Sequence, residues 1–416
     1  GGGDVFTWPN MSNYGKIAQD RFGILPFGPC ENIIQISVAA EQRDYNLVSC
    51  SELLFMEYDP SHCLPQEINE LFSNELHTGL KSGVDKAKIN ALRARLNSDE
   101  KLYYLDTDTM KDELDLAEEL LSGKSSGAII EGVQSRNASA DSSNYSQSGS
   151  VLQPLKVTAG ANQEITVYVE GIPEGEKLEV FASQYNAEAS AWLSSMGSLH
   201  NGRNILMVPK IGSQSTQRGG SLYFTYSGIG ADSIKLHIRR GTNIPVLELS
   251  DWYKMTEVAK TNTISNYLTE LDAYIAKAGI TESNKTTNIK NVTEISTPTV
   301  LLSIPALAVK NSTTATGADR VQALFNSVLA WEDVMHICKF TQGIDKTYEQ
   351  NDMQTRQNIR CMQMFSGAFM YAAGNHIGIG YGSCAGMAGG TPVNPSTVGT
   401  QNNLFGWGIA HEIGHN

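Results

Sequence analysis

The sequence His411-Glu412-Ile413-Gly414-His415-Asn416, at the end of the chain, fits the H-E-x-x-H pattern of zinc peptidases. On a helix, residues i and i+4 share a face, so His411 and His415 can bind one metal ion between them. Glu412 then lies beside the same ion and can take a proton from an attacking water. The hexapeptide therefore predicts a helix that binds Zn²⁺ through His411 and His415 and uses Glu412 as the general base.

An amphipathic helix with two solvent-facing histidines is the alternative to a metal site. The residues before the motif favour a buried helix, because Leu404, Trp407 and Ile409-Ala410 are apolar. Two buried histidines side by side need polar partners, and a metal ion is the simplest one.

The motif supplies only part of the ligand set that a catalytic zinc needs. Such a site has three protein ligands and one open position. The third ligand either follows Asn416 in a longer protein or comes from an upstream residue. We expect it downstream, because no helix stop signal accompanies the motif. This chain alone is then expected to be inactive, with a catalytic domain whose C-terminal part is missing.

The length and the net charge of the chain limit the number of domains and the kinds of partner. A chain of 416 residues is long enough for two or three domains, and its formal net charge of −13 disfavours nucleic acids and anionic membranes as partners. No apolar run reaches the length of a membrane span. The longest, Val300 to Val309, contains Ser303 and Pro305 and predicts a buried strand. The opening Gly1-Gly2-Gly3 is compatible with a removed export signal.

The cysteines do not indicate a second metal site. They are widely spaced and form no C-x-x-C pair, so they either pair as disulfides or stay buried and reduced. The six are Cys30, Cys50, Cys63, Cys338, Cys361 and Cys384.

The first part of the chain, residues 1–122, is predicted to be a helical accessory region. Helices are expected from Pro65, over Lys86 to Leu96, and after Thr109, which resembles the start of a capping box. Gly123 is placed to end the third helix. The Ser-, Gly- and Asn-rich stretch 123–150 is predicted to be a linker.

Residues 151–252 change to a period of two. Ile165, Val167 and Val169 begin a series of short alternating strands between Gly-rich turns, which predicts a β-sandwich. The sandwich either supports the next domain or binds glycans.

Residues 253–416 are predicted to form a mainly helical, zincin-like catalytic domain. One helical region is expected over Tyr253 to Ala278 and another over Asp319 to Cys338. Ile359 to Tyr381 is apolar and Gly-rich, which favours strands and turns just before the motif. His336 is predicted to be an exposed or capping residue rather than a ligand. His376 is predicted to have a structural role rather than to line a substrate cleft. The whole chain is thus expected to be a multidomain α+β protein.

The run from Asn403 to Asn416 resembles the enhancin-type zinc metallopeptidases of peptidase family M60. Their core pattern is Trp-Gly, two residues, His-Glu, two residues and His-Asn, which matches the chain from Trp407 onward. The run Val300 to Ala306 is similar to a strand in the middle of that family. The resemblance covers about 151–416.

The resemblance implies a gluzincin, in which a Glu on a later helix is the third zinc ligand. It implies His411 and His415 as ligands, Glu412 as general base and Trp407 packed beside the site. It also implies secreted or cell-surface anchored bacterial enzymes that act on mucins and other O-glycosylated proteins. This chain departs from the family where members often carry Met-His-Ala-Gly, because it has Met370-Tyr371-Ala372-Ala373-Gly374.

The sequence thus predicts a Zn²⁺-dependent endopeptidase that hydrolyses mucin-like glycoproteins. The alternative is a non-catalytic, glycan-binding surface protein that keeps a remnant of the H-E-x-x-H motif. The metal content of the protein separates the two.

Overall fold

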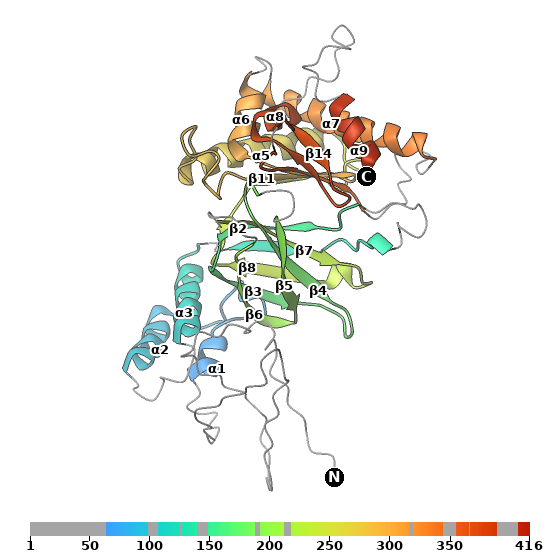
Figure 1. Cartoon of the computed structure of the whole chain (residues 1–416). Helices are drawn as coiled ribbons and strands as arrows, with labels where there is room; N and C mark the ends of the chain where they lie inside the picture. Colours follow the sequence, from blue (N-terminus) through green and yellow to red (C-terminus); the bar gives the residue numbers. More distant parts are fainter. Residues whose placement is uncertain are drawn as a thin grey trace, which may run out of the picture. The chain divides into compact units, whose positions relative to one another are not determined.

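The computed structural model divides the chain into two compact units, Gly1–Ser126 and Gly127–Asn416 (Figure 1). The described residues are 64–98, 107–124, 127–139, 141, 149–187, 192–211, 218–315, 319–343, 355–365, 367–388 and 407–416. Predictions for residues 1–63 and for the stretch around Leu404 lie outside them.

The described part of the first unit consists of the helices α1 (Leu64–Asn69), α2 (Lys86–Ser98) and α3 (Thr107–Leu121). Helical spacing predicts one apolar stripe over Met110, Leu114, Ala117 and Leu121 of α3. The first three are buried, whereas Leu121 is 42% exposed. Gly123 ends α3 with a φ of 72° and with the paired backbone hydrogen bonds of a Schellman motif. The predicted capping box is wrong, because Thr109 lies inside α3 instead of before it.

The second unit begins with two antiparallel sheets that face each other as a sandwich. One has the order β1-β8-β3-β6 and the other the order β5-β4-β7-β2-β9. Apolar side chains of both sheets form one core. The strands are β1 (Ala128–Glu131), β2 (Gln153–Gly160), β3 (Glu164–Glu170), β4 (Leu178–Ser183), β5 (Leu193–Leu199), β6 (Gly202–Met207), β7 (Gly219–Tyr226), β8 (Lys235–Arg239) and β9 (Thr242–Asn243), with the 3₁₀ helix η2 (Ala231–Ser233) before β8.

The predicted linker differs from the structure. Strand β1 lies within residues 123–150 and pairs with β8 from Ala128 opposite Ile238 to Glu131 opposite Lys235. Its Ile130 is buried in the sandwich core. A strand of four residues is too short to change the average composition of residues 123–150, which is polar. The composition therefore does not indicate β1.

The C-terminal part of the second unit contains a mixed six-stranded sheet of order β10-β11-β12-β13-β15-β14. Parallel pairs join β10 to β11, β12 to β13 and β13 to β15, and the other pairs are antiparallel. The strands are β10 (Val246–Glu248), β11 (Thr293–Ser296), β12 (Val300–Ile304), β13 (Gln357–Cys361), β14 (Met370–Ala372) and β15 (Ile377–Ile379).

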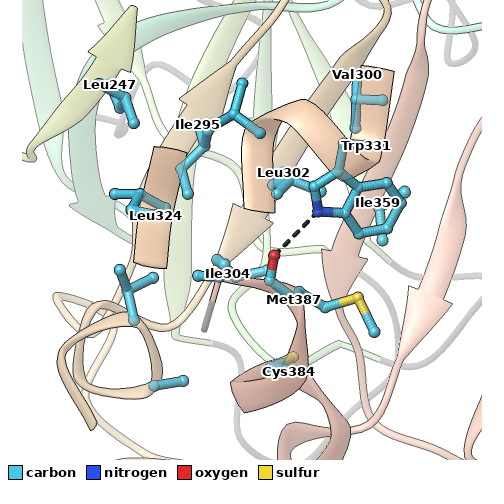
Figure 2. Close-up of a cluster of buried hydrophobic side chains, with 14 of the residues drawn as sticks. Leu247, Ile295, Val300, Leu302, Ile304, Leu324, Trp331, Ile359, Cys384 and Met387 are labelled. Carbon is cyan, nitrogen blue, oxygen red and sulfur yellow. Dashed lines mark hydrogen bonds between the residues drawn. The ribbon is translucent and has the colours of Figure 1, made fainter. Parts of the chain in front are cut away.

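Helices cover one face of this sheet (Figure 1). They are α5 (Glu257–Lys277), α6 (Ala306–Ala315), α7 (Arg320–Thr341), α8 (Tyr381–Cys384), the 3₁₀ helix η3 (Ala385–Met387) and α9 (Trp407–His415). In α7, Leu324, Val328, Trp331 and Met335 are buried on one stripe, and Val321 and Cys338, which helical spacing places on the same face, are half-buried against the same core. Figure 2 shows Trp331 beside Leu302 and Ile359, with its indole nitrogen donating to the carbonyl oxygen of Met387 at 2.9 Å.

Strand β12 shows why the sheet is buried on both faces. Val300, Leu302 and Ile304 belong to the core under the helices, whereas Leu301 packs with Tyr223 of the sandwich. Successive side chains of a strand point to opposite faces, so a continuous apolar run fits a strand covered on both sides. This confirms the first half of the buried strand predicted over Val300 to Val309. The second half of that prediction is wrong, because helix α6 begins at Ala306.

A buried polar cluster joins the sandwich to the six-stranded sheet. The Tyr223 hydroxyl donates to Glu294 Oε1 at 2.6 Å, and the Ser303 hydroxyl donates to Glu294 Oε2 at 2.6 Å. Arg360 donates to Asn358 Oδ1 at 3.0 Å and to the Tyr223 oxygen at 3.3 Å. These five side chains, Tyr223, Glu294, Ser303, Asn358 and Arg360, form the buried polar cluster.

The buried polar cluster explains why residues 127–416 form one unit. Its side chains are at most 5% exposed, and Arg360 also lies over the Trp192 ring of the sandwich at 4.4 Å. A boundary near residue 252, predicted from the change of period, does not separate two compact units. The mixed α and β class of the prediction is confirmed. Among the described residues, none of the helices is long and apolar enough to cross a membrane.

Candidate metal centre

Helix α9 carries the H-E-x-x-H motif and packs against α7 and β14. Ile413 is 3% exposed and belongs to the core under α7, whereas His411 and His415 are exposed. Ile413 stands two residues from each histidine, which is about 200° around a helix. Burying Ile413 therefore turns the two histidines toward solvent, and the expectation of two buried histidines is wrong.

The two imidazoles converge at one point. His411 Nε2 and His415 Nε2 lie 3.0 Å apart, and their ring planes are at 89°. A tetrahedral zinc bound at 2.0–2.1 Å keeps two nitrogens about 3.3 Å apart. Without an ion, one ring N–H donates to the lone pair of the other ring. The nitrogen pair therefore fits two positions of a zinc site with only a small adjustment.

The rest of the predicted ligand set is not found among the described residues. Glu412 is half-buried and directly follows His411, as a base beside the metal requires. The described part of the chain contains no cluster of three His, Cys, Asp or Glu side chains that could hold a metal ion. The third ligand expected beyond Asn416 stays a prediction.

Asn416 ties the end of α9 to the sheet. Its Oδ1 accepts from the backbone N–H of Gly374 at 2.9 Å, and its Nδ2 donates to Gln357 Oε1 at 3.1 Å. Gln357 begins β13, and Gly374 lies in the turn between β14 and β15. Sequence reasoning gave no role to Asn416 beyond its place in the motif, because its partners are far away along the chain.

Strand β14 is the edge of the sheet nearest the motif. Among the described strands it pairs only with β15, from Met370 opposite Ile379 to Ala372 opposite Ile377. Met370 and Ile379 point into the core under the helices, where Ile413 of α9 also lies. Within the described residues, one edge of β14 thus has backbone N–H and C=O groups without a strand partner, and β14 packs against the helix that carries His411 and His415.

His376 has a structural role, as predicted. It is 1% exposed, its Nε2 lies 2.9 Å from the Tyr371 hydroxyl, and its ring packs on Trp192. Burial, and then the nearby Arg360 charge, lower its pKa to about 3. A neutral, enclosed imidazole on the sandwich side of the sheet does not share an ion with His411 and His415.

The other predicted side chains take structural positions or lie outside the described part. His336 is half-buried and stacks with Phe340 on α7. Cys338, Cys361 and Cys384 are free thiols in the described part, and the other three cysteines lie outside it. The side chain of Trp407 also lies outside it.

No protein-family model matches the chain, and no curated protein does. Solved structures do. The M60 catalytic domain of Clostridium perfringens ZmpB, solved with its CBM32-1 and CBM32-2 domains, matches at 22% identity and a TM-score of 0.59, over 85% of this chain and 34% of that one. A metallopeptidase from Bacteroides thetaiotaomicron matches at 15% identity and a TM-score of 0.54, over 88% of this chain and 53% of that one.

A third solved structure also matches the chain. The catalytic module of the Clostridium perfringens metalloprotease ZmpA matches at 18% identity and a TM-score of 0.51, over 69% of this chain and 53% of that one. The chain spans about a third to a half of the solved chains that it matches. These likenesses show an M60-like metallopeptidase fold.

Proposed function

We propose that the protein is a zinc-dependent endopeptidase of the enhancin-type, gluzincin class that hydrolyses mucin-like O-glycosylated proteins. The observation that carries the proposal is the convergence of His411 Nε2 and His415 Nε2, 3.0 Å apart, on a helix that packs beside the edge strand β14. The M60-like fold supports it, and the substrate class rests on the sequence resemblance. A secreted or surface-anchored bacterial location belongs to the same proposal.

In this proposal His411 and His415 hold the metal, and Glu412 moves the proton. Bound Zn²⁺ would polarise the scissile carbonyl and lower the pKa of water to about 7. Glu412 takes the proton of the attacking water and passes it to the leaving amine. Glu412 is half-buried and directly follows His411 in sequence, which supports this role.

The edge of β14 would hold the substrate backbone. Free N–H and C=O groups of an edge strand can pair with an extended peptide, so that the peptide becomes an additional strand. Such pairing would bring the substrate beside α9, the helix that carries His411 and His415. It is independent of peptide sequence, which suits glycosylated substrates whose side chains carry sugars.

Glu412→Gln in the complete protein tests the chemistry. The variant should cleave a mucin-type glycoprotein about 10²–10⁴-fold more slowly, because general acid–base help is worth that much. It should keep bound zinc, because His411 and His415 are unchanged. New peptide termini measured by mass spectrometry give the rate, and elemental analysis gives the zinc content.

Glu174→Gln, an exposed turn residue of the sandwich, is the matched control and should cleave at the wild-type rate. Near-wild-type cleavage by the Glu412→Gln variant would exclude the proposed role of Glu412. If the wild-type protein binds mucin glycans without zinc and without new termini, the glycan-binding alternative replaces the peptidase.

A further inference from the structure

Asn416 contacts two separate parts of the six-stranded sheet through one side chain. Its carbonyl oxygen accepts from the Gly374 N–H at 2.9 Å, and its amide nitrogen donates to Gln357 Oε1 at 3.1 Å. Its own backbone N–H donates to the carbonyl oxygen of Ile413 at 3.2 Å, which keeps it on the last turn of α9. Both polar ends of the amide are therefore used.

The two partners belong to different strands with different roles. Gln357 begins β13, an interior strand that pairs with β12 and β15. Gly374 lies in the tight turn that leads from the edge strand β14 into β15, where Ala373 N–H donates to the carbonyl oxygen of His376 at 3.0 Å. The φ of 67° at Gly374 favours glycine at this point of the turn. Asn416 thus links α9 to a fixed strand and to the edge hairpin at once.

We propose that Asn416 is a positioning residue that fixes the edge strand β14 relative to His411 and His415. Asn416 directly follows His415, so their Cα atoms are only about 3.8 Å apart. A displacement of Asn416 therefore also displaces His415. In the proposed peptidase, β14 holds the substrate and the histidines hold the metal. The Asn416 contacts then set the distance between the bound peptide and the metal. This inference rests on the proposed function.

The amide group explains why asparagine serves here. It offers one acceptor for the Gly374 N–H and one donor for Gln357. An aspartate keeps the acceptor, and the Gln357 amide can turn to donate its own N–H to the second carboxylate oxygen. A leucine has nearly the same shape but neither polar group. The two substitutions therefore separate the hydrogen bonds from the volume of the side chain.

The experiment compares Asn416→Leu, Asn416→Asp and Gln357→Leu with the wild type in the complete protein. We expect Asn416→Leu to keep its zinc and to lose about 10–100-fold in kcat, with KM within about 3-fold, because a misplacement of 1 Å can cost about 10² in rate. Asn416→Asp should keep most of the wild-type kcat. Gln357→Leu, which removes one contact and leaves α9 unchanged in sequence, should fall between them.

The readouts are zinc per chain, kcat and KM on a mucin-type glycoprotein, and the melting temperature. A wild-type kcat in both leucine variants overturns the inference. So does a loss of kcat that only follows a loss of zinc or of folded protein, because Asn416 would then merely stabilise α9. If Asn416→Leu does not fold, Gln357→Leu decides by the same criteria. A wild-type protein without zinc and without cleavage overturns the proposed function as well, so the two failures are distinguishable.

Discussion

The exposed end of α9 and the buried polar cluster are two groups of polar side chains in opposite surroundings. In the buried polar cluster, Glu294 is 0% exposed and accepts from two hydroxyl groups, and Arg360 donates to several oxygens. On α9, His411 and His415 are exposed and bring two ring nitrogens to one point. Buried polar groups must satisfy one another, whereas convergent exposed groups can bind a ligand.

The buried polar cluster should therefore determine stability, and the exposed end of α9 should determine metal binding. Substitutions in the buried polar cluster should change the free energy of unfolding and leave zinc binding by the folded protein unchanged. Substitutions at His411 or His415 should weaken zinc binding and leave the free energy of unfolding of the metal-free protein unchanged. Variants that break this separation would show that the two regions are coupled through the sheet between them.

Arg360→Met should have the largest effect on stability. Removing one partner of a buried charged pair costs about 3–5 kcal/mol of the free energy of unfolding. Arg360→Met leaves the buried Glu294 without this cationic neighbour. Urea denaturation of the metal-free protein measures the loss. Lys254→Met is the control, since the Lys254–Asp251 ion pair is exposed on both sides and should contribute less than about 0.5 kcal/mol. A loss below about 1 kcal/mol for Arg360→Met would contradict the assignment of stability to the buried polar cluster.

His411→Ala and His415→Ala should each weaken zinc binding by about 100-fold, or about 2.7 kcal/mol. The unfolding free energy of the metal-free protein should change by less than about 0.5 kcal/mol, because both side chains are exposed. Calorimetric titration with Zn²⁺ measures the zinc affinity. Urea denaturation of the metal-free protein measures the unfolding free energy. His200→Ala, in the sandwich, should leave the zinc affinity unchanged. Unaltered affinity in both α9 variants would place the metal elsewhere.

Local patterns predicted those parts of the molecule that depend on neighbours along the chain. The spacing of His411 and His415 predicts their common face, and the apolar run from Val300 predicts the buried strand β12, although the end of that run belongs to α6. The stripe of α7 follows from a period of 3.6. Each of these features needs only a regular helix or strand and no knowledge of distant residues.

Features that depend on distant residues could not be predicted in the same way. The partners of Asn416 lie 42 and 59 residues away in sequence, and nothing near Gln357 or Gly374 indicates α9. The exposure of His411 follows from Ile413 finding a place in the core, which the apolar flanks alone did not reveal. Strand β1 is stabilised by pairing with β8 rather than by its own composition.

The smallest expected effect is the pH dependence that His376 adds next to the buried polar cluster. Burial and the Arg360 charge lower its pKa to about 3, from about 6.5 in the unfolded chain. The unfolded state therefore binds the proton more readily, and stability that is present above pH 6.5 is lost as the pH falls toward 3. Between pH 7 and pH 6 the loss should be about 0.7 kcal/mol.

His376→Gln removes this titration and keeps a polar group near the Tyr371 hydroxyl. The unfolding free energy of the metal-free wild type should thus fall more steeply from pH 7 to pH 6 than that of the variant, by about 0.7 kcal/mol. Equal slopes would mean that the imidazole can be protonated in the folded protein. His376 would then belong with the solvent-facing histidines of α9 rather than with the interior, and the division between the two regions would not hold at the sandwich side of the sheet.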